Sequence, residues 1–575
     1  MHGDRWRRFG FVSEHPMTGP TVAIKSVLPL ATATSTRLEK CIVNGHQHRA
    51  IASYAFSNPL PRSAVFLKNS IPNLVVTRIP SSNCRCSTGR STMDASAKAG
   101  HDLLHFINVS PTPFHAVHQV KQRLEKAGFQ HLQEKDPWAK ICAPGGKYYL
   151  TRNASTILAF AIGKKWKPGN PIAMIGAHTD SCTLRVKPVS KKQSDGFIQV
   201  GVETYGGGLW HTWFDRDLSI AGRAFVKAGD GSYTQKLIKI DRPILRIPTL
   251  AIHLDRQEKF EFNKETQLFP IAGLAAAELN RTGQSHHTPS SSTTEEEADF
   301  APLKATIERH HPYMVELIAK EAKVDPSEVM DFEMVLYDTQ KACVGGLNEE
   351  LMFSPRLDNL EMSYCSAMGL INSLHSPSSL DEETAIRLIS LFDHEEIGSE
   401  TAQGANSNFL PTMVRRLSAL SLKGSGEPDA DAYEQTLSKS FLVSADMAHS
   451  VNPNYTSKYE SNHKPEMNKG TVIKINANAR YATNSPGIVL IEEAARRARV
   501  PLQLFVVRND SSCGSTIGPM LSSSLGTRTL DLGNPQLSMH SIRETGGVYD
   551  VEHAIKLFES FFEHYSELEK KFVVD

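Results

Sequence analysis

Five short segments place histidine or acidic side chains directly after apolar runs that are typical of buried strands, or on loops that open a helix. Imidazole nitrogens and carboxylate oxygens are ligands that zinc prefers. A neighbouring glutamate can serve as a general base. The side chains are His178 and Asp180 in 176–180, Asp358 in 355–360, Glu395 and Glu396 in 392–400, Asp446 and His449 in 443–455, and His540 in 537–544.

Each segment by itself has an ordinary structural alternative. The alternative for His178 is a hydrogen bond within a loop, and Asp180 would fix its tautomer if it is a ligand. The alternative for Asp358 is a helix N-cap, and for Glu395 and Glu396 it is a solvated turn. Together the segments supply two histidines and three or four carboxylates. That set suits two zinc ions a few ångströms apart that share one carboxylate.

Apolar runs that alternate with helical stretches must position these side chains. Such alternation is typical of a parallel sheet covered on both faces, in which ligands bind beyond the carboxyl ends of the strands. The expected strands are 155–163, 171–176, 386–392, 440–445, 502–507 and 528–532, and the expected helices are 113–128, 359–374, 411–421, 488–498 and 552–569.

The middle of the chain has a different pattern. Residues 186–270 contain short alternating segments, such as 198–203 and 246–252, which predict a β-rich insertion. Residues 281–299 are polar and of low complexity, so we expect a mobile loop there.

Six segments in this order resemble the aspartyl aminopeptidase family of dinuclear zinc aminopeptidases, which also includes vacuolar aminopeptidase I. They are GAHTD, YGGGLWHTWFDRDL, PRLDNL, DHEEIGSE, SADMAHSVNPNY and MHSIRE. The resemblance implies a fold of the α/β class: an α/β/α metallopeptidase domain with a mixed, largely parallel sheet and an inserted β-rich dimerisation domain. It also implies release of N-terminal Asp or Glu from peptides.

The resemblance assigns a role to each metal-site residue. Two Zn²⁺ ions per subunit are expected, one site being exchangeable with Mn²⁺ or Co²⁺. His178 and His540 would be the terminal ligands, Asp358 would bridge the ions, and Glu396 and Asp446 would complete the set. Glu395 would be the general base, and Asp180 would orient His178.

Recognition of an acidic side chain requires a cation. Lys474 lies in the apolar segment 471–475, where a lysine is unusual unless it is paired or used. The resemblance places Lys474 and Tyr481 at the acidic side-chain pocket, His449 facing the substrate, and His253 in the site of a neighbouring subunit. We expect Lys474 to be unpaired, with a solvent-reaching head as the alternative.

The predicted organisation has four parts. Residues 1–92 form a leader, 93–185 and 345–575 form the catalytic domain, and 186–344 form the insertion. The resemblance implies dimers that assemble into a tetrahedral dodecamer. Trp210, Trp213 and Phe214 are expected at a subunit interface, and Cys182 and Cys513 are expected to be packing residues.

The leader is basic and nearly free of acids, with 12 Lys and Arg against 3 Asp and Glu in residues 1–92. With its Ser and Thr content this is typical of an organelle transit peptide. We expect a chloroplast location, with cytoplasm or vacuole as alternatives and Met93 as a second start. A disordered extension without an address is the other interpretation.

Composition excludes some classes of partner. The net charge of +1 and the absence of an apolar run long enough for a bilayer indicate neither a nucleic-acid nor a membrane partner. The eight scattered cysteines form no CxxC pair, which argues against a disulfide framework. Two other functions stay open: a two-metal carboxypeptidase or deacylase, and a catalytically idle scaffold.

Overall fold

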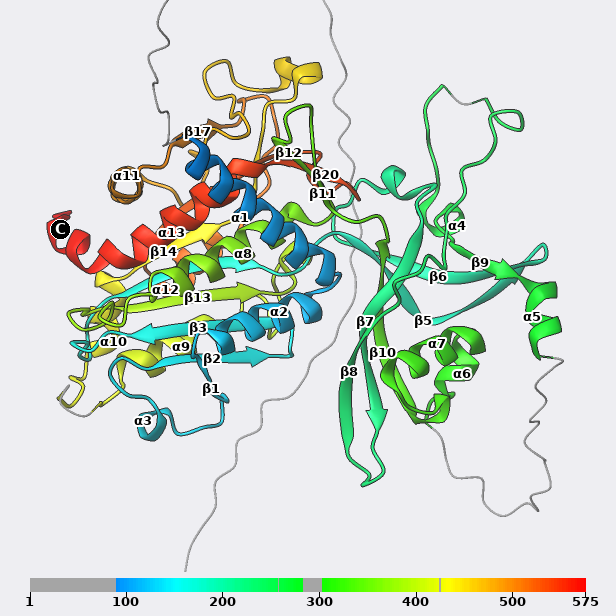
Figure 1. Ribbon diagram of the computed structural model, residues 1–575, viewed down its shortest axis with the longest axis horizontal. Helices are drawn as coiled ribbons and strands as arrows, with labels where there is room; N and C mark the ends of the chain where they lie inside the picture. The colour runs from blue at the N-terminus through cyan, green and yellow to red at the C-terminus, as the bar shows by residue number, and fades with distance from the viewer. Residues whose placement is uncertain (1–88, 257, 283–301, 423–425, 575) are drawn as a thin grey trace, which may run out of the picture. The chain divides into compact units, whose positions relative to one another are not determined.

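A nine-stranded sheet forms the centre of the structure. The computed structural model describes residues 89–256, 258–282, 302–422 and 426–574, and the sheet order is β1-β2-β3-β13-β4-β14-β18-β16-β17 (Figure 1). Five of its eight neighbouring pairs are parallel, which confirms the expected mixed, largely parallel sheet. The strands are β1 (Gln130–His131), β2 (Lys147–Arg152), β3 (Thr156–Ile162), β4 (Ile172–His178), β13 (Ile386–Phe392), β14 (Phe441–Ala445), β16 (Thr471–Ile475), β17 (Leu502–Val506) and β18 (Arg528–Gly533).

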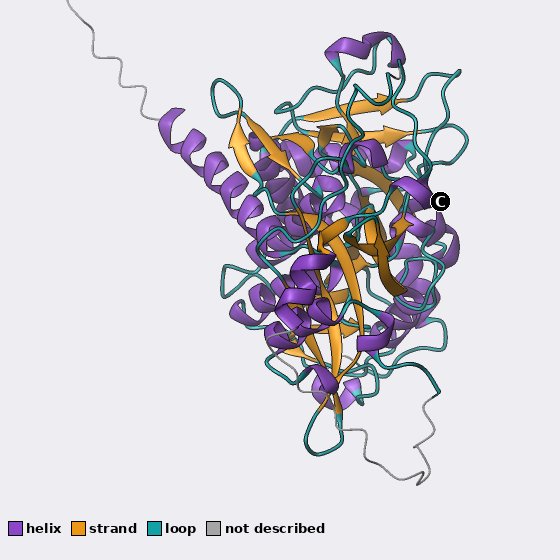
Figure 2. Ribbon diagram, turned by 90° about the vertical axis from the view of Figure 1, so that its right-hand side faces the viewer, coloured by secondary structure: helices purple, strands orange, loops and turns teal. Residues whose placement is uncertain are grey.

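Helices lie against the sheet (Figures 1 and 2). They pack on it through two separate apolar cores. The first core holds α1 (Gly89–Val109), α2 (Pro113–Lys126), α8 (Leu357–Asn372), α11 (Ser485–Ala498) and α13 (Val548–Leu568). The second holds α3 (Trp138–Ile141), α9 (Phe409–Ser418), α10 (Ala432–Lys439) and α12 (Ile517–Leu525). Two cores on one sheet make the α/β/α arrangement that was expected.

The central strands are apolar because both of their faces are covered. Every residue of β3, β4, β13 and β14 is buried. The edge strand β17 is different, since Leu504 is 47% exposed there. A strand is present at 502–506 as predicted, but the prediction that it is buried was wrong.

The insertion is built on a second, six-stranded sheet in the order β8-β7-β10-β5-β6-β9. Apolar side chains of this sheet and of α7 form its core. Its elements begin at Thr183 and end at Asp338, whereas the predicted boundaries are 186 and 344. They are β5 (Thr183–Ser194), β6 (Phe197–Tyr205), η1 (Trp210–Trp213), β7 (Leu218–Lys227), β8 (Tyr233–Lys239), α4 (Lys264–Gln267), β9 (Ile271–Leu274), α5 (Ala275–Thr282), α6 (Thr306–Arg309), α7 (Pro312–Ala322), η2 (Pro326–Glu328) and β10 (Val329–Asp338).

Two expectations for the insertion were wrong. Residues 246–252 form no strand and make only an isolated bridge from Arg246 to Ile271. Proline lacks the N–H that a ladder needs, and Pro248 interrupts this segment. Trp210 and Trp213 are 5% and 3% exposed within the insertion core, so they pack inside their own chain and not at a subunit interface.

A third, small sheet in the order β11-β12-β20-β19-β15 combines segments that lie far apart in the sequence. It consists of β11 (Cys343–Gly345), β12 (Leu351–Ser354), β15 (Ala448–His449), β19 (Pro535–Leu537) and β20 (Glu544–Gly547). Short 3₁₀ turns complete the fold: η3 (Glu395–Ile397), η4 (Pro453–Lys458) and η5 (Glu569–Lys571).

Several predictions concern residues outside the described ones. Residues 1–88 and 283–301 are among them, so the leader and nearly all of the predicted loop 281–299 stay predictions. Within 89–574, apart from the gaps, no helix has the length and apolar character that a bilayer crossing needs. The five cysteines of these residues are all free.

Gly533, the last residue of β18, allows this strand to approach Asp446 closely. A Cβ at this position would lie 1.7 Å from the main-chain oxygen of Asp446. Gly533→Ala must therefore push β18 away from β14, and overpacking of this kind costs about 1–3 kcal/mol. We expect a lower thermal unfolding midpoint by differential scanning fluorimetry.

Gly229→Ala is the matched control, because nothing lies within 4 Å of the added Cβ. It should unfold at the wild-type temperature. Equal midpoints for the two variants would contradict the proposed steric role of Gly533.

Candidate active site

Three adjacent parallel strands, β13, β4 and β14, bring the first group of predicted residues to one edge of the large sheet. His178 is the last residue of β4, and Asp446 directly follows β14. Glu395 and Glu396 open the turn η3 just after β13. Since the carboxyl ends of parallel strands share an edge, these four side chains start from neighbouring positions.

The small third sheet carries the other two predicted ligands. Asp358 follows β12 at the start of α8, and His540 lies just beyond β19. Asp358 has φ −79° and ψ 106°, so it is not helical, and no side-chain cap hydrogen bond is formed at this helix start. The N-cap alternative for Asp358 is therefore wrong.

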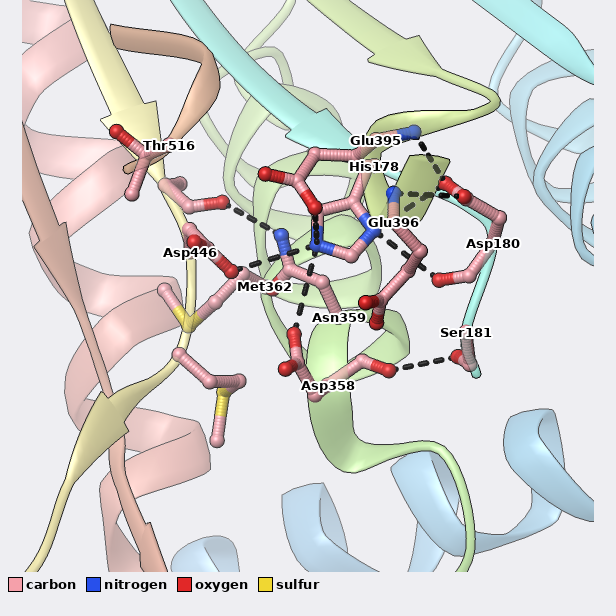
Figure 3. A network of polar contacts seen from close by, with 12 residues as sticks. His178, Asp180, Ser181, Asp358, Asn359, Met362, Glu395, Glu396, Asp446 and Thr516 are labelled. Atoms are coloured by element: carbon pink, nitrogen blue, oxygen red, sulfur yellow. Dashed lines mark hydrogen bonds and ion pairs between the residues drawn. The ribbon is translucent and has the colours of Figure 1, made fainter. Parts of the chain in front are cut away.

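The other four predicted ligands lie around Asp358. Figure 3 shows His178, Glu396 and Asp446 beside it. Its Oδ1 lies 3.4 Å from His178 Nε2, and its Oδ2 lies 3.4 Å from His540 Nε2. Asp446 Oδ1 lies 3.4 Å from His178 Nε2, and Glu396 Oε2 lies 3.3 Å from His540 Nε2. Asp358 thus lies between two pairs of potential ligands.

The residues fit metal ions at these positions. Atoms that share an ion through bonds near 2 Å lie roughly 3.3 Å apart, as the edges of a tetrahedron, and the observed separations are close to this. Asp358 Oδ1 and Glu396 Oε1 are buried and make no hydrogen bond with any described residue. Such oxygens are costly to bury unless a cation uses them.

The charges of the cluster also favour cations. Burial by itself lowers the pKa of His178, but the surrounding carboxylates, Glu395 foremost, raise it well above its usual value. Hydrogen bonding to Asp358 raises the pKa of His540 to about 12. Burial acts to raise the pKa of Asp358, yet the two imidazoles outweigh it and hold that pKa far below its usual range. Bound metal ions would replace these protons.

Asp180 contacts the cluster differently from the prediction. His178 Nδ1 donates to the main-chain oxygen of Asp180 at 3.0 Å, whereas the carboxylate Oδ1 is 3.4 Å away. The carboxylate instead accepts the main-chain N–H groups of Glu395 and Glu396, both at 3.1 Å, and the hydroxyl of Tyr205 at 2.7 Å. The main-chain oxygen of Asp180 therefore fixes the tautomer of His178, and its side chain holds the turn that carries Glu395 and Glu396.

Glu395 lies beside the ligands without being the closest of them. Its Oε2 is 3.8 Å from His178 Nε2. Burial raises the pKa of Glu395 to about 8 and that of Glu396 to about 7. A carboxylate that titrates close to neutral pH is suited to proton transfer.

Lys474 is buried but not unpaired, so that prediction was wrong. Its Nζ lies 3.3 Å from Asp446 Oδ2 and donates to the main-chain oxygen of Met447 at 3.2 Å. A buried ammonium group needs such compensation. The ring of Tyr481 lies 5.2 Å from the same nitrogen.

The two remaining predicted histidines lie in different places. His449 is an exposed residue of β15 that packs edge-on against Phe505 of β17. Partial desolvation, followed by the charge of Lys474, lowers its pKa. His253 is exposed in a loop of the insertion and makes no contact with the cluster that the structure records within the described residues. The structure thus brings His449 towards the cluster but leaves His253 away from it.

Main-chain groups of Gly207 and Leu209 hold His540, and neither residue was predicted to do so. Its Nδ1 donates to the main-chain oxygen of Gly207 at 3.2 Å, which leaves Nε2 free to face the cluster. The N–H of Leu209 donates to the main-chain oxygen of His540 at 2.9 Å. The three consecutive glycines at 206–208 were the available signal.

Cys182 was expected to pack, and this was wrong. Its Sγ donates to Glu396 Oε2 at 3.1 Å, and its ligand atom lies within 4.8 Å of those of Glu396 and His540. A contact between segments 214 residues apart leaves no local pattern in the sequence.

Comparison with known proteins identifies relatives that match most of the described region. Residues 106–562 match the family "Aminopeptidase I zinc metalloprotease (M18)". An aspartyl aminopeptidase of Aspergillus oryzae is 70% identical over 484 residues, which cover 82% of this chain and 97% of the relative.

Solved structures agree with this result. The cryo-EM structure of the Ape4 and Nbr1 complex has a TM-score of 0.76 and 50% identity, and covers 85% of this chain and 89% of that one. The structure of the S. cerevisiae mApe1 dodecamer has a TM-score of 0.70 and 32% sequence identity. The match covers 83% of this chain and 99% of that one.

The central position of Asp358 predicts the metal content of variants. We expect about two zinc ions per wild-type chain by inductively coupled plasma mass spectrometry. Asp358→Ala should lose both ions, because its carboxylate faces both histidines, whereas His540→Ala should retain about one at the His178 side.

Glu361→Gln is the matched control, since this buried carboxylate on the same helix bonds to Asn534 and to no ligand. It should keep the wild-type content. Two ions retained by Asp358→Ala would contradict the shared position of this carboxylate.

Proposed function

The chain belongs to the M18 family of aminopeptidase I zinc metalloproteases, and from this premise we propose that it releases N-terminal aspartate or glutamate from peptides. The observation that carries the proposal is the buried ammonium group of Lys474, 3.3 Å from the metal-cluster residue Asp446. A cation next to the reacting centre favours substrates whose side chain is negative.

We further propose that the cluster holds two ions, with His178 and Asp446 on one, Glu396 and His540 on the other, and Asp358 between them. Zinc bound there supplies Lewis acidity, which polarises a carbonyl group and lowers the pKa of water. Exchange of one ion for Mn²⁺ or Co²⁺ is part of the proposal, because oxygen and imidazole ligands accept all three metals.

Glu395 is proposed to move the protons of the reaction. Its carboxylate lies 3.8 Å from His178 Nε2, and its main-chain N–H is fixed by Asp180. In this position Glu395 takes a proton from the attacking water and gives it to the leaving amine. The pKa of about 8, which burial causes, allows the same group to accept and release the proton near neutral pH.

Lys474 and Tyr481 are proposed to hold the acidic side chain of the substrate. Lys474 is 2% exposed, so a neutral substrate side chain would gain nothing from its charge. His449, at the rim of the same region, is proposed to contact the substrate as well.

His253 is proposed to act in the site of a neighbouring subunit, and the assembly is proposed to be a dodecamer like the similar mApe1 structure. The support is the surface around His253, where Leu250, Ile252 and Leu254 are 59%, 67% and 76% exposed. Apolar side chains as exposed as these are typical of a surface that another chain covers.

The organelle address of the leader is a further proposal. It rests on the 12 basic and 3 acidic residues of 1–92, and the family match begins only at residue 106. A chloroplast location remains the preferred one, with cytoplasm and vacuole as alternatives.

Peptides with N-terminal Asp, Glu, Ala or Leu test the reaction and the base. The wild-type chain should release Asp and Glu, and should leave acetylated peptides and neutral N-termini intact. Glu395→Gln should keep its metal content but lower kcat roughly 100-fold or more, because proton transfer is lost. Liquid chromatography of the released amino acids measures the substrate preference and kcat.

Glu400→Gln is the control, as an exposed glutamate of the same loop. It should behave as wild type. Release of C-terminal residues from acetylated peptides would replace the proposal with a carboxypeptidase, and full activity of Glu395→Gln would remove the assigned base.

Lys474→Met tests the specificity separately. The variant should lose activity on Asp peptides by roughly 10–100-fold more than on Leu peptides, because the ion pair with the substrate is removed. The ratio of kcat/KM values for the two peptides measures this. An equal loss on both would assign Lys474 to the support of Asp446 alone.

A further inference from the structure

Glu544 is a buried carboxylate at the centre of the small third sheet. It is the first residue of β20, opposite Ser354 of β12, and is 2% exposed. Within the described residues no lysine, arginine or histidine side chain forms an ion pair with it. Burial, and then the charge of Asp358, raises its pKa well above the usual value.

The two oxygens of Glu544 contact the main chains of two ligands. Oε2 accepts the N–H of Asp358 at 3.1 Å, and Oε1 accepts the N–H of His540 at 2.9 Å. The side chains of these same residues approach each other to 3.4 Å. One carboxylate therefore links the segments that form the Asp358–His540 half of the cluster.

These segments need an external restraint. His540 has φ 66° and Arg356, two residues before Asp358, has φ 56°. Left-handed backbone in residues other than glycine costs of the order of 1 kcal/mol each and persists only when surrounding contacts hold it. The hydrogen bonds of Glu544 are contacts of that kind.

The other half of the cluster has a corresponding arrangement. The carboxylate of Asp180 accepts the main-chain N–H groups of Glu395 and Glu396. Two buried carboxylates, Asp180 and Glu544, thus hold the backbones of ligand segments on different sides of Asp358. Neither needs to touch an ion itself to determine where the ligands stand.

We propose that Glu544 is a positioning residue that sets the distance between Asp358 and His540, and thereby the affinity of the metal position that His540 and Glu396 serve. The His178–Asp446 position depends on it less, since Glu544 contacts neither of those residues and reaches that position only through the main chain of Asp358. The inference rests on the proposed function only insofar as the cluster binds two ions.

Glu544→Gln in the full chain tests this. The amide keeps the shape of the side chain but offers one accepting oxygen, so either Asp358 or His540 loses its partner. Stepwise zinc binding in competition with a chelator should show one site weakened roughly 10–100-fold and the other weakened much less. A merely structural role would weaken neither site selectively.

Asp550→Asn is a closely matched control. Asp550 is also fully buried and accepts two main-chain N–H groups, from Asn468 at 2.5 Å and Gly470 at 2.8 Å, but no ligand is among them. It should keep both zinc affinities even if its unfolding midpoint falls. Equal zinc binding by Glu544→Gln and wild type would overturn the inference.

Glu544→Asp is the second variant, because the shorter side chain keeps the charge but cannot reach both amides. It should show the same selective loss. Failure of both Glu544 variants to fold would assign the residue to folding and overturn its positioning role. Peptidase assays of the wild type keep the two proposals apart: an inactive wild type with two zinc sites removes the function and leaves this inference in place.

Discussion

The site depends on positive charge that compensates a cluster of buried carboxylates. The carboxylates of Asp180, Asp358, Glu395, Glu396 and Asp446 meet within a few ångströms of two imidazoles. Carboxylates that are buried together repel and favour their protonated forms unless cations are present. Protonated histidines, Lys474 and bound metal ions can each supply the compensating positive charge, so a site of this composition is suited to binding cations.

The fold places these charges where the backbone can hold them. Strands β13, β4 and β14 are completely buried, so their carboxyl ends form a rigid edge for three of the ligand segments. Asp358 and His540 follow strands of a separate small sheet, which combines segments from 343–354, 448–449 and 535–547. Apolar burial therefore determines half of the site, and a few buried hydrogen bonds determine the other half.

The ligands and the layered fold could be predicted from the sequence because both leave local signals in it. An apolar run predicts a buried strand, and a polar residue after it predicts a position at the sheet edge, as for His178 and Asp446. The partners of Lys474 and Cys182 left no such signal, since each pairs with a residue distant in the chain, and Glu544 links the nearby His540 to the distant Asp358. The insertion boundaries were displaced by a few residues because β5 continues directly from the metal-site loop.

In the proposed function, Asp446 connects catalysis with specificity. One of its oxygens faces His178 Nε2 at 3.4 Å, and the other faces Lys474 Nζ at 3.3 Å. A carboxylate that shares its charge with a metal ion neutralises a neighbouring ammonium group less completely. The positive charge that remains on Lys474 is then available to an acidic side chain of the substrate. In the proposed function, an ion bound at Asp446 would both activate the reaction and strengthen the selection of the substrate, because both effects would act through the same carboxylate.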